Sequence, residues 1–451
     1  MSVRSRGVDG TVSEDLTIGL EWERLEEGPE EERSCFGLLR IAHGDIQLAE
    51  GVDGFIERVR RGPLVSGYHL AEWLAWSWWR LTREPRPDSP SSDWQLAHCL
   101  STVGAGYLWP NITIYSDRER AILIARPTRP KGFTAFRFTG DQTVILPAGE
   151  FESTLDILME QIQGKLRVDG IAATNLDRIW DEVLAERADP QSATQRELEA
   201  MLGYDPDEAD PEEIQRLLAD ATELGRDAII ELSAAQHHGR MPPTSDEIAS
   251  LANRLGTEMR PADIVDIEGL DLGIRATTPA WQQGYQAARA VREHHALGQE
   301  PLTDEALARL CGVAAGILEP RQGAPFSFAL DDLPHEHGRL VLRSRHPMSR
   351  RFDLARLLGD RIGSSLGERL IPVTSAHTYR QKRQRAFAAE LLCPFEALEA
   401  FLDGDYSDSA REDAADHFRV SERTVCTLLV NHRRLDRSTL GGDPDAVDAA
   451  A

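Results

Sequence analysis

The apolar residues of this chain change their spacing near residue 150, and this change constrains the fold more than any other feature. Before that point, apolar runs rich in β-branched residues, such as NITIY at 111–115 and AILIA at 121–125, are separated by polar residues. That pattern is typical of antiparallel strands. Between residues 151 and 274, five segments carry apolar residues at helical spacing instead. We therefore predict an α+β fold that begins with an antiparallel sheet and continues with helices.

The length of 451 residues exceeds what one ordinary hydrophobic core supports. We predict an α+β domain, an acidic helical region, a third compact domain and a disordered tail, over residues 1–148, 149–275, 276–436 and 437–451. Residues that can cap the N-termini of the middle helices are Ser153, Asn175, Ser192, Asp210 and Thr244.

Two further helices are predicted within the first domain. The segment FIERVRRG at 55–62 reads as a short amphipathic helix, and Trp73, Trp76 and Trp79 recur at three-residue spacing in a second one. Tryptophans can stack on nucleic acid bases, but Arg80 is the only cation on this helix. Packing in a hydrophobic core is therefore the favoured interpretation.

The charge distribution limits the partners that the chain can bind. A net charge of −25 disfavours broad contact with nucleic acids or anionic membranes. Residues 339–385 are the exception, with twelve Lys or Arg against three Asp or Glu. This stretch could meet nucleic acid locally, an acidic protein partner, or the chain's own acidic segment at 181–230, which is the least demanding choice. That acidic segment is itself either a solvated face or a surface for a basic partner.

The cysteines and the hydropathy pattern predict a cytoplasmic protein. No apolar run has the length of a membrane helix, and the first ten residues lack the apolar core of a secretion signal. The five cysteines are scattered, form no C-x-x-C pair and are expected to be reduced core residues: Cys35, Cys99, Cys311, Cys393 and Cys426. The adjacent His237 and His238 point in different directions on a helix, so a shared metal is not expected.

The most informative segment is the decapeptide RFDLARLLGD, residues 351–360. It resembles the active helix of the ImmA/IrrE metallopeptidase family, which carries a motif close to R-F-T-L-A-H-E-L-G-H. In such a helix two histidines one turn apart bind zinc, and the glutamate is the general base for the attacking water. Here Arg356 and Asp360 stand at the histidine positions and Leu357 at the glutamate position. Arg356 cannot bind a cation, and Leu357 cannot accept a proton.

A second segment, QKRQRAFAAELLCP at 381–394, is similar to the family's second signature, in which a carboxylate ahead of the phenylalanine completes the metal site. Gln381 and Arg383 occupy the two candidate ligand positions. The resemblance covers roughly residues 281–435 and implies a zincin-like domain with a degenerate HExxH motif, without metal or other cofactor. We predict ion pairing in place of zinc, between Arg356 and Asp360 along the helix and between Asp360 and Arg383.

A relocated metal site is the alternative to a metal-free domain. His335, Glu336, His337 and His377 flank the region, and a His-x-His pair on a strand points both rings to one face. Pro334 and Gly338 border the pair, however, and favour a loop.

The last informative segment, Ala414–Leu435, has the pattern of a helix, a short turn at 420–421 and a second helix. DNA could be contacted through Arg423, Thr424 and Thr427. The family also uses a segment of this form to complete its domain core, and Val425, Leu428 and Leu429 are expected to be buried. We favour core completion over DNA contact.

These features predict a non-catalytic regulatory or scaffolding protein that binds a protein partner through an inactivated peptidase-like domain. The family resemblance implies a bacterial setting of stress response, mobile-element control or phage defence. Two alternatives stay open: a metallo-endopeptidase with unusual ligands that cleaves a regulator, and a transcriptional regulator that binds DNA through its C-terminal helices. The sequence does not specify the oligomeric state.

Overall fold

The computed structural model describes residues 15–129, 132–236, 240–265, 278–332, 336–363 and 368–440. The chain forms two compact units, the first from residues 1–82 and 90–193 and the second from residues 83–89 and 194–451. The boundary falls within helix α7, so the expected acidic helical region contributes to both units. No helix among the described residues is long and apolar enough to cross a membrane.

The first unit is an α+β structure, as predicted, but its strands form three small antiparallel sheets where one was expected. Its strands are β1 (Leu16–Trp22), β2 (Phe36–His43), β3 (Ile46–Gln47), β4 (Gly51–Asp53), β5 (Arg58–Arg60), β6 (Leu64–Ser66), β7 (Ile112–Ser116), β8 (Arg120–Ala125), β9 (Phe136–Phe138) and β10 (Thr143–Pro147). Its helices are α1 (Glu30–Ser34), α2 (Gly67–Trp76), α3 (Trp78–Arg83), α4 (Ser92–His98), the 3-10 helix η1 (Leu100–Thr102), α5 (Ala148–Val168), α6 (Asn175–Ala188) and the start of α7 (Pro190–Met201).

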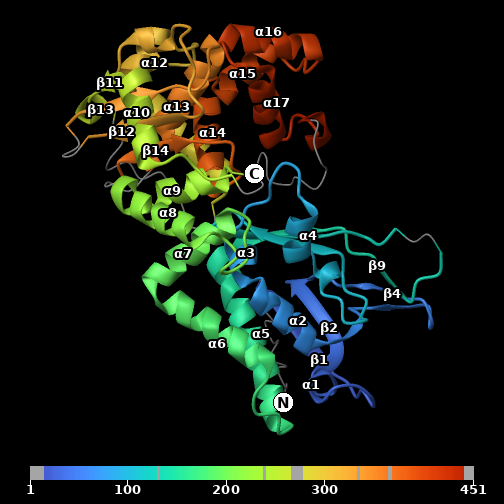
Figure 1. Ribbon diagram of the computed structural model, residues 1–451. Helices are drawn as coiled ribbons and strands as arrows, with labels where there is room; N and C mark the ends of the chain where they lie inside the picture. The colour runs from blue at the N-terminus through green and yellow to red at the C-terminus, as the bar shows by residue number, and fades with distance from the viewer. Residues whose placement is uncertain are drawn as a thin grey trace, which may run out of the picture. The chain divides into compact units, whose positions relative to one another are not determined.

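Each sheet is built around one central strand. Strand β2 pairs with β1, β3 and β6, strand β8 lies between β7 and β10, and strand β4 lies between β5 and β9. All six residues of β8 are buried, because its continuous apolar run is covered on both faces. Helix α5 packs against β1 and helix α2 against β2, and both are seen beside these strands in Figure 1.

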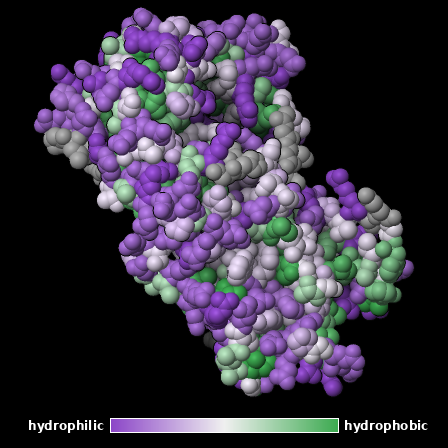
Figure 2. Space-filling view, in the orientation of Figure 1, coloured by the Kyte–Doolittle hydropathy of each residue, from purple (hydrophilic) through white to green (hydrophobic). Residues whose placement is uncertain are grey.

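The predicted helix at 55–62 is wrong. Arg58–Arg60 form strand β5, which pairs antiparallel with β4, and β4 pairs in turn with β9, more than 80 residues further along the chain. The Asp53 carboxylate accepts the N–H groups of Phe55 and Ile56 and closes a turn between the strands. Pairing with a distant strand therefore overrides the helical pattern. Figure 2 shows apolar surface in this region, where Phe55 and Phe133 are 75% and 73% exposed.

The tryptophan segment packs largely in the core, as predicted. It forms two short helices, because α2 ends at Trp76 and α3 begins at Trp78. Trp78 and Trp79 are buried, and the indole of Trp79 donates to Glu186. Of the three tryptophans in the prediction, only Trp79 is buried, since Trp73 is partly exposed and Trp76 is 55% exposed.

Two of the predicted helix caps are confirmed. The side chains of Asp210 and Thr244 accept backbone N–H groups at the starts of α8 and α10. Asn175 is the first residue of α6, whose cap is Thr174. Ser153 and Ser192 lie inside α5 and α7, because those helices begin earlier than the apolar pattern indicates.

The second unit places a four-stranded antiparallel sheet among helices. Its strands, in the order β11-β13-β12-β14, are β11 (Thr257–Met259), β13 (Gly338–Val341), β12 (Ser327–Asp331) and β14 (Leu370–Val373). Its helices are the end of α7, α8 (Pro211–Leu224), α9 (Arg226–Ala234), α10 (Ser245–Leu255), η2 (Pro261–Asp263), α11 (Ala280–His294), α12 (Asp304–Leu310), η3 (Ala315–Leu318), α13 (Pro347–Gly363), α14 (Tyr379–Leu392), α15 (Phe395–Leu402), α16 (Asp408–Phe418), α17 (Glu422–Asn431) and η4 (Arg437–Leu440).

Apolar side chains cover both faces of this sheet. Phe328 and Leu330 of β12 pack in a cluster with residues of α8, α9 and α10. Ala329, which points to the other face, packs in a second cluster with residues of α11, α13 and α14. Residues 281–310 contain helices α11 and α12, and the PFSFAL and GRLVLRS segments contain strands β12 and β13. Residues 437–440, placed in the predicted tail, form the 3-10 helix η4, and residues 441–451 lie outside the described part.

The long contact between α11 and α14 buries a carboxyl group, that of Glu390, for which the described residues provide no ion pair. Glu390 is 2% exposed and accepts the backbone N–H of Phe395 at 3.0 Å. Burial raises the pKa of Glu390 to about 8. An acid whose pKa is higher in the folded than in the unfolded state makes the protein less stable as pH rises between the two values.

We therefore expect Glu390 to lower the melting temperature of the second unit as pH rises from 5 to 8. The Glu390→Gln substitution is expected to remove this part of the pH dependence, because glutamine keeps the hydrogen-bond acceptor without the charge. Calorimetric melting at several pH values measures this. The matched control is Glu396→Gln, since the Glu396 side chain is 57% exposed. A pH dependence that is unchanged in Glu390→Gln would contradict the expectation.

Candidate functional site

Helices α13 and α14 bring the two sequence motifs into contact. Gly359 of the first motif faces Phe387 of the second so closely that a Cβ atom at Gly359 would lie 2.5 Å from the phenylalanine ring. Leu357, at the position of the family's glutamate, is 3% exposed and belongs to the core. The degenerate positions therefore lie inside the second unit, between packed helices.

Arg356, at the first histidine position, is 6% exposed and bonds to neutral groups. Its Nη2 donates to the carbonyl of Thr374 at 2.8 Å, to Oε1 of Gln381 at 2.7 Å and to Oε1 of Gln384 at 3.3 Å. The predicted ion pair with Asp360 does not form in the described structure, although the spacing of four residues allows it. The glutamines of α14 provide the acceptors instead.

Asp360, at the second histidine position, is fully buried in an arginine pair. Arg380 donates through Nε and Nη2 to both carboxylate oxygens at 2.7–3.0 Å, and Nη2 of Arg383 lies 3.5 Å from Oδ1. The predicted pairing of Asp360 with Arg383 is confirmed, and Arg380 was not foreseen. Burial alone would raise the pKa of Asp360, but Arg380 outweighs it and holds the pKa below its usual range.

Gln381, at a candidate ligand position, is fully buried and joins α14 to the end of β14. Its Oε1 accepts the N–H of Thr374 at 2.9 Å, and its Nε2 donates to the carbonyl of Pro372 at 3.2 Å. Both ends of the amide are thus bonded within the protein. Its oxygen already receives the Arg356 guanidinium, which would repel a metal ion.

Metal-binding groups are not gathered in the described part of the chain, where no cluster of three His, Cys, Asp or Glu residues could hold an ion. His335 lies outside the described residues, as do His237 and His238. The Nε2 atom of His377 lies 2.8 Å from the Asp88 carboxylate. Burial, together with the nearby Arg385 charge, lowers the pKa of His377 although Asp88 opposes this shift.

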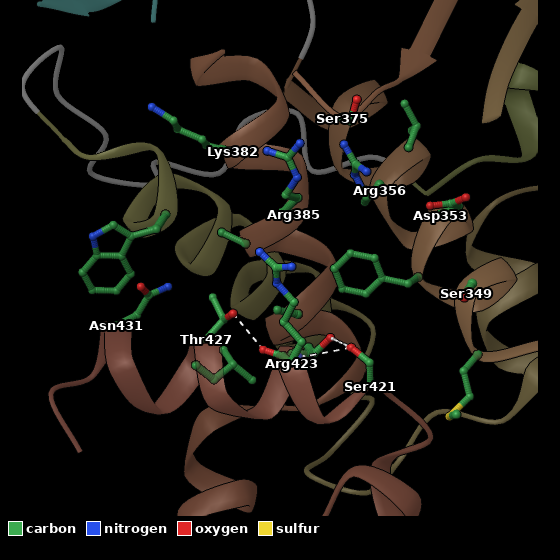
Figure 3. A pocket seen from close by; sticks show the side chains of 18 of the residues that line it. Ser349, Asp353, Arg356, Ser375, Lys382, Arg385, Ser421, Arg423, Thr427 and Asn431 are labelled. Carbon is green, nitrogen blue, oxygen red and sulfur yellow. Dashed lines mark hydrogen bonds between the residues drawn. The ribbon is translucent and has the colours of Figure 1, made fainter. Parts of the chain in front are cut away.

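A cavity of about 580 Å³ opens beside Arg356. Its walls come from α11, the segment before α13, α13, the segment after β14, α14 and α17. Five lining residues are cationic and two are carboxylates: Arg343, Arg356, Lys382, Arg385 and Arg423, with Asp88 and Asp353. Figure 3 shows Arg423 extending from α17 toward Arg385, with Arg356 beyond it on α13. Arg356 is therefore part of the wall of a cationic cavity.

The predicted DNA-contact residues line this same cavity. Thr424 is 7% exposed, and its hydroxyl lies 2.9 Å from that of Ser421. The hydroxyl of Thr427 donates to the carbonyl of Arg423. Of the three predicted contact residues, only Arg423 is exposed. Val425, Leu428 and Leu429 are buried in the core of the unit, so core completion by α16 and α17 is confirmed.

The cavity cations remain charged at neutral pH although burial disfavours the charge. Burial lowers the pKa of Arg356 to about 10. The pKa of Arg385 is lowered to about 9, mainly by burial and further by the like charges of Arg356 and Arg423. Both values lie above 7, so the two guanidinium groups hold positive charge inside the protein.

Most other cations of the basic stretch have partners within the second unit. Arg351 pairs with Asp304, Arg361 with Asp331, and Arg369 with Glu223. Glu223 belongs to the acidic segment at 181–230, and the backbone N–H of Ala228 in that segment donates to Glu368, so the basic and acidic segments are in contact.

The five cysteines form no disulfide in the described structure, and all of them are buried except the partly exposed Cys99.

Several residues of the cavity and of the hydrogen-bond network around Arg356 were not foreseen. Gln384 and Arg385 follow Gln381 at spacings of three and four, so a helical projection of α14 could have placed them beside it. Trp281 and Asp88 come from distant parts of the sequence and carry no local signal.

No protein-family model, no curated protein and no solved structure that was compared with this chain matches it. The fold and the site together define an α+β protein in which a cationic cavity lies beside Arg356.

Proposed function

We propose that the protein is a non-catalytic regulator whose second unit is an inactivated relative of the ImmA/IrrE peptidases and binds a protein partner without cutting it. One observation carries the proposal: the positions that would bind zinc and activate water hold Arg356, Leu357 and Asp360. Arg356 and Asp360 are bonded to other side chains of the protein, and Leu357 is buried in the apolar core. A guanidinium repels a divalent cation, and the Asp360 carboxylate is already neutralised by Arg380.

The order of elements supports the likeness to a zincin-like peptidase domain. Two helices, two strands, the motif helix, a third strand and the second motif helix follow one another from α11 to α14. The contact of Gly359 with Phe387 shows how residues shared with the family motifs serve packing. Residues that pack are retained while residues that would catalyse are replaced, which is the pattern of a pseudoenzyme.

The partner is expected to be a regulatory protein in a bacterial stress, mobile-element or phage-defence system, as the family resemblance implies. The test captures binding proteins with the full chain and incubates each purified pair with zinc and, separately, with a chelator. Intact mass spectrometry is expected to find the partner uncleaved in both. Fragments that form with zinc and not with the chelator would support a metallo-endopeptidase with unusual ligands instead.

The DNA-binding alternative predicts duplex binding that weakens steeply with salt and disappears when Arg423, Arg433 and Arg434 are neutralised. The burial of Thr424 and the position of α17 in the core argue against a helix that enters a groove. We therefore expect no salt-sensitive duplex binding by the full chain in an electrophoretic mobility assay.

A further inference from the structure

The cavity beside Arg356 is lined by more positive charges than the carboxylates in its lining can neutralise. The guanidinium groups of Arg343, Arg356, Arg385 and Arg423 make no ion pair with a carboxylate in the described structure. Nη2 of Arg385 donates to the carbonyl of Ala376 at 2.7 Å, and Arg356 bonds to a carbonyl and two amides. Neutral acceptors hold these side chains in place without cancelling their charge.

One of these groups also has an unsatisfied donor. The Nε of Arg356 is buried and has no hydrogen-bond partner in the described structure. A buried donor without a partner and a buried charge without a counter-ion both cost free energy. A bound anion would supply both the missing hydrogen-bond acceptor and the missing counter-ion. The two carboxylates that line the cavity do not supply them, because Asp353 accepts the hydroxyl of Ser327 and Asp88 lies beside His377.

The other side of the cavity is aromatic. The rings of Trp281 and Tyr285 lie 5.7 and 5.2 Å from the ring of His432, and all three residues line the cavity. Burial lowers the pKa of His432, so its ring is neutral at pH 7. A neutral aromatic wall facing a group of guanidiniums suits a ligand with a flat ring at one end and negative charge at the other.

We infer that this cavity binds a nucleoside phosphate, with the phosphates among Arg343, Arg356, Arg385 and Arg423 and the base against the aromatic wall. A volume of about 580 Å³ falls within the range of small-molecule sites, roughly 300–1,000 Å³. Arginine is suited to phosphate because its planar group donates two parallel hydrogen bonds. The inference goes beyond the proposed function, since it assigns a small ligand that partner binding does not require.

The experiment uses isothermal titration calorimetry on the full chain with ATP, GTP, CTP and UTP, each tested alone. Adenosine and inorganic pyrophosphate serve as separate probes of the base and of the charge, and a hexaglutamate peptide tests an acidic polypeptide. Arg423→Gln and Arg343→Gln are the test variants, because both side chains are exposed and their loss leaves the core intact. Arg433→Gln and Arg345→Gln are matched controls, exposed arginines outside the cavity.

At least one nucleotide is expected to bind with one-to-one stoichiometry and a Kd below about 1 mM. Each test variant is expected to weaken that binding about ten-fold, the effect of losing one hydrogen bond to a charged group, and each control to leave it unchanged. Adenosine and pyrophosphate are expected to bind more weakly than the nucleotide.

The inference is overturned if no nucleotide binds at 1 mM, or if the test variants bind as well as the controls. If pyrophosphate bound as tightly as the nucleotide, the base would make no contribution to binding. Hexaglutamate binding that is tighter than nucleotide binding and sensitive to Arg423→Gln would assign the cavity to an acidic polypeptide. None of these outcomes depends on whether the protein binds zinc, so the proposed function is tested separately.

Discussion

Replacing Asp360 by asparagine is expected to lower the free energy of unfolding of the second unit by about 3–5 kcal/mol, as removal of one member of a buried ion pair does. Asp360 is fully buried, and the substitution leaves Arg380 and Arg383 without their shared counter-charge. Hydrogen exchange of peptides from α13 and α14, measured across a urea series, determines the loss of unfolding free energy in these two helices.

The control for this substitution is Asp408→Asn in the same unit. Asp408 also pairs with an arginine, Arg411, but is 92% exposed, so its loss is expected to cost no more than about 1 kcal/mol. The Asp360 pair should also be sensitive to acid. Because the folded pKa of Asp360 lies below the unfolded value, its contribution is complete above the unfolded pKa and is lost as pH falls through the folded one. Equal effects of the two substitutions would contradict the buried pair.

Gly284→Ala is expected to destabilise the second unit by about 1–3 kcal/mol, the range for overpacking a well-packed contact. A Cβ atom at this position of α11 would lie 2.4 Å from the carbonyl oxygen of Arg383 and 2.7 Å from the backbone nitrogen of Phe387. Backbone atoms of α14 cannot turn aside as a side chain can, so the two helices must separate. Calorimetric melting of the full chain measures the change.

The matched control is Gly164→Ala in α5, where a Cβ atom would meet nothing within 4 Å. Alanine is the better helix former, so this substitution is expected to stabilise the first unit by up to about 1 kcal/mol. The two glycine substitutions should thus have opposite signs. A stabilising effect of Gly284→Ala would show that α11 and α14 are not packed as closely as described.

The sequence predicted the elements whose pattern is local. The runs around Ile114 and Ile122 became β7 and β8 because both strand preference and burial act on neighbouring residues. Asp210 and Thr244 were placed as caps because a cap depends on residues within one turn. The helix expected at 55–62 failed because β4 and β9 pair across a long stretch of chain, which no local pattern records.

For the candidate site, the sequence predicted which residues lie in one region better than it predicted which residues bond to one another. The motif comparison placed Arg356, Asp360 and Gln381 in one region, and the structure brings all three into buried networks. Helical spacing then predicted an Arg356–Asp360 pair, but Arg380 offers Asp360 two parallel hydrogen bonds from the facing helix. Two donors in one plane bind a carboxylate more strongly than a neighbour one turn away.

The cavity itself could not have been predicted from the pattern of single segments. Arg423 was selected as a possible DNA contact because it follows the turn before the last helix. The packing of α17 on the core instead turns this residue toward Arg385. Only the tertiary arrangement places Trp281, more than 140 residues earlier, in the lining of the same cavity.

The most direct test of the central claim, that the altered motif holds protein ion pairs in place of zinc, is the metal content of the full chain. The protein is purified without chelators, dialysed against zinc, freed of unbound metal and measured by inductively coupled plasma mass spectrometry. The structure predicts zinc far below one equivalent per chain, because Arg356 and the Asp360–Arg380 pair occupy the ligand positions. One tightly held equivalent of zinc that the Asp360→Asn substitution removes would contradict the account.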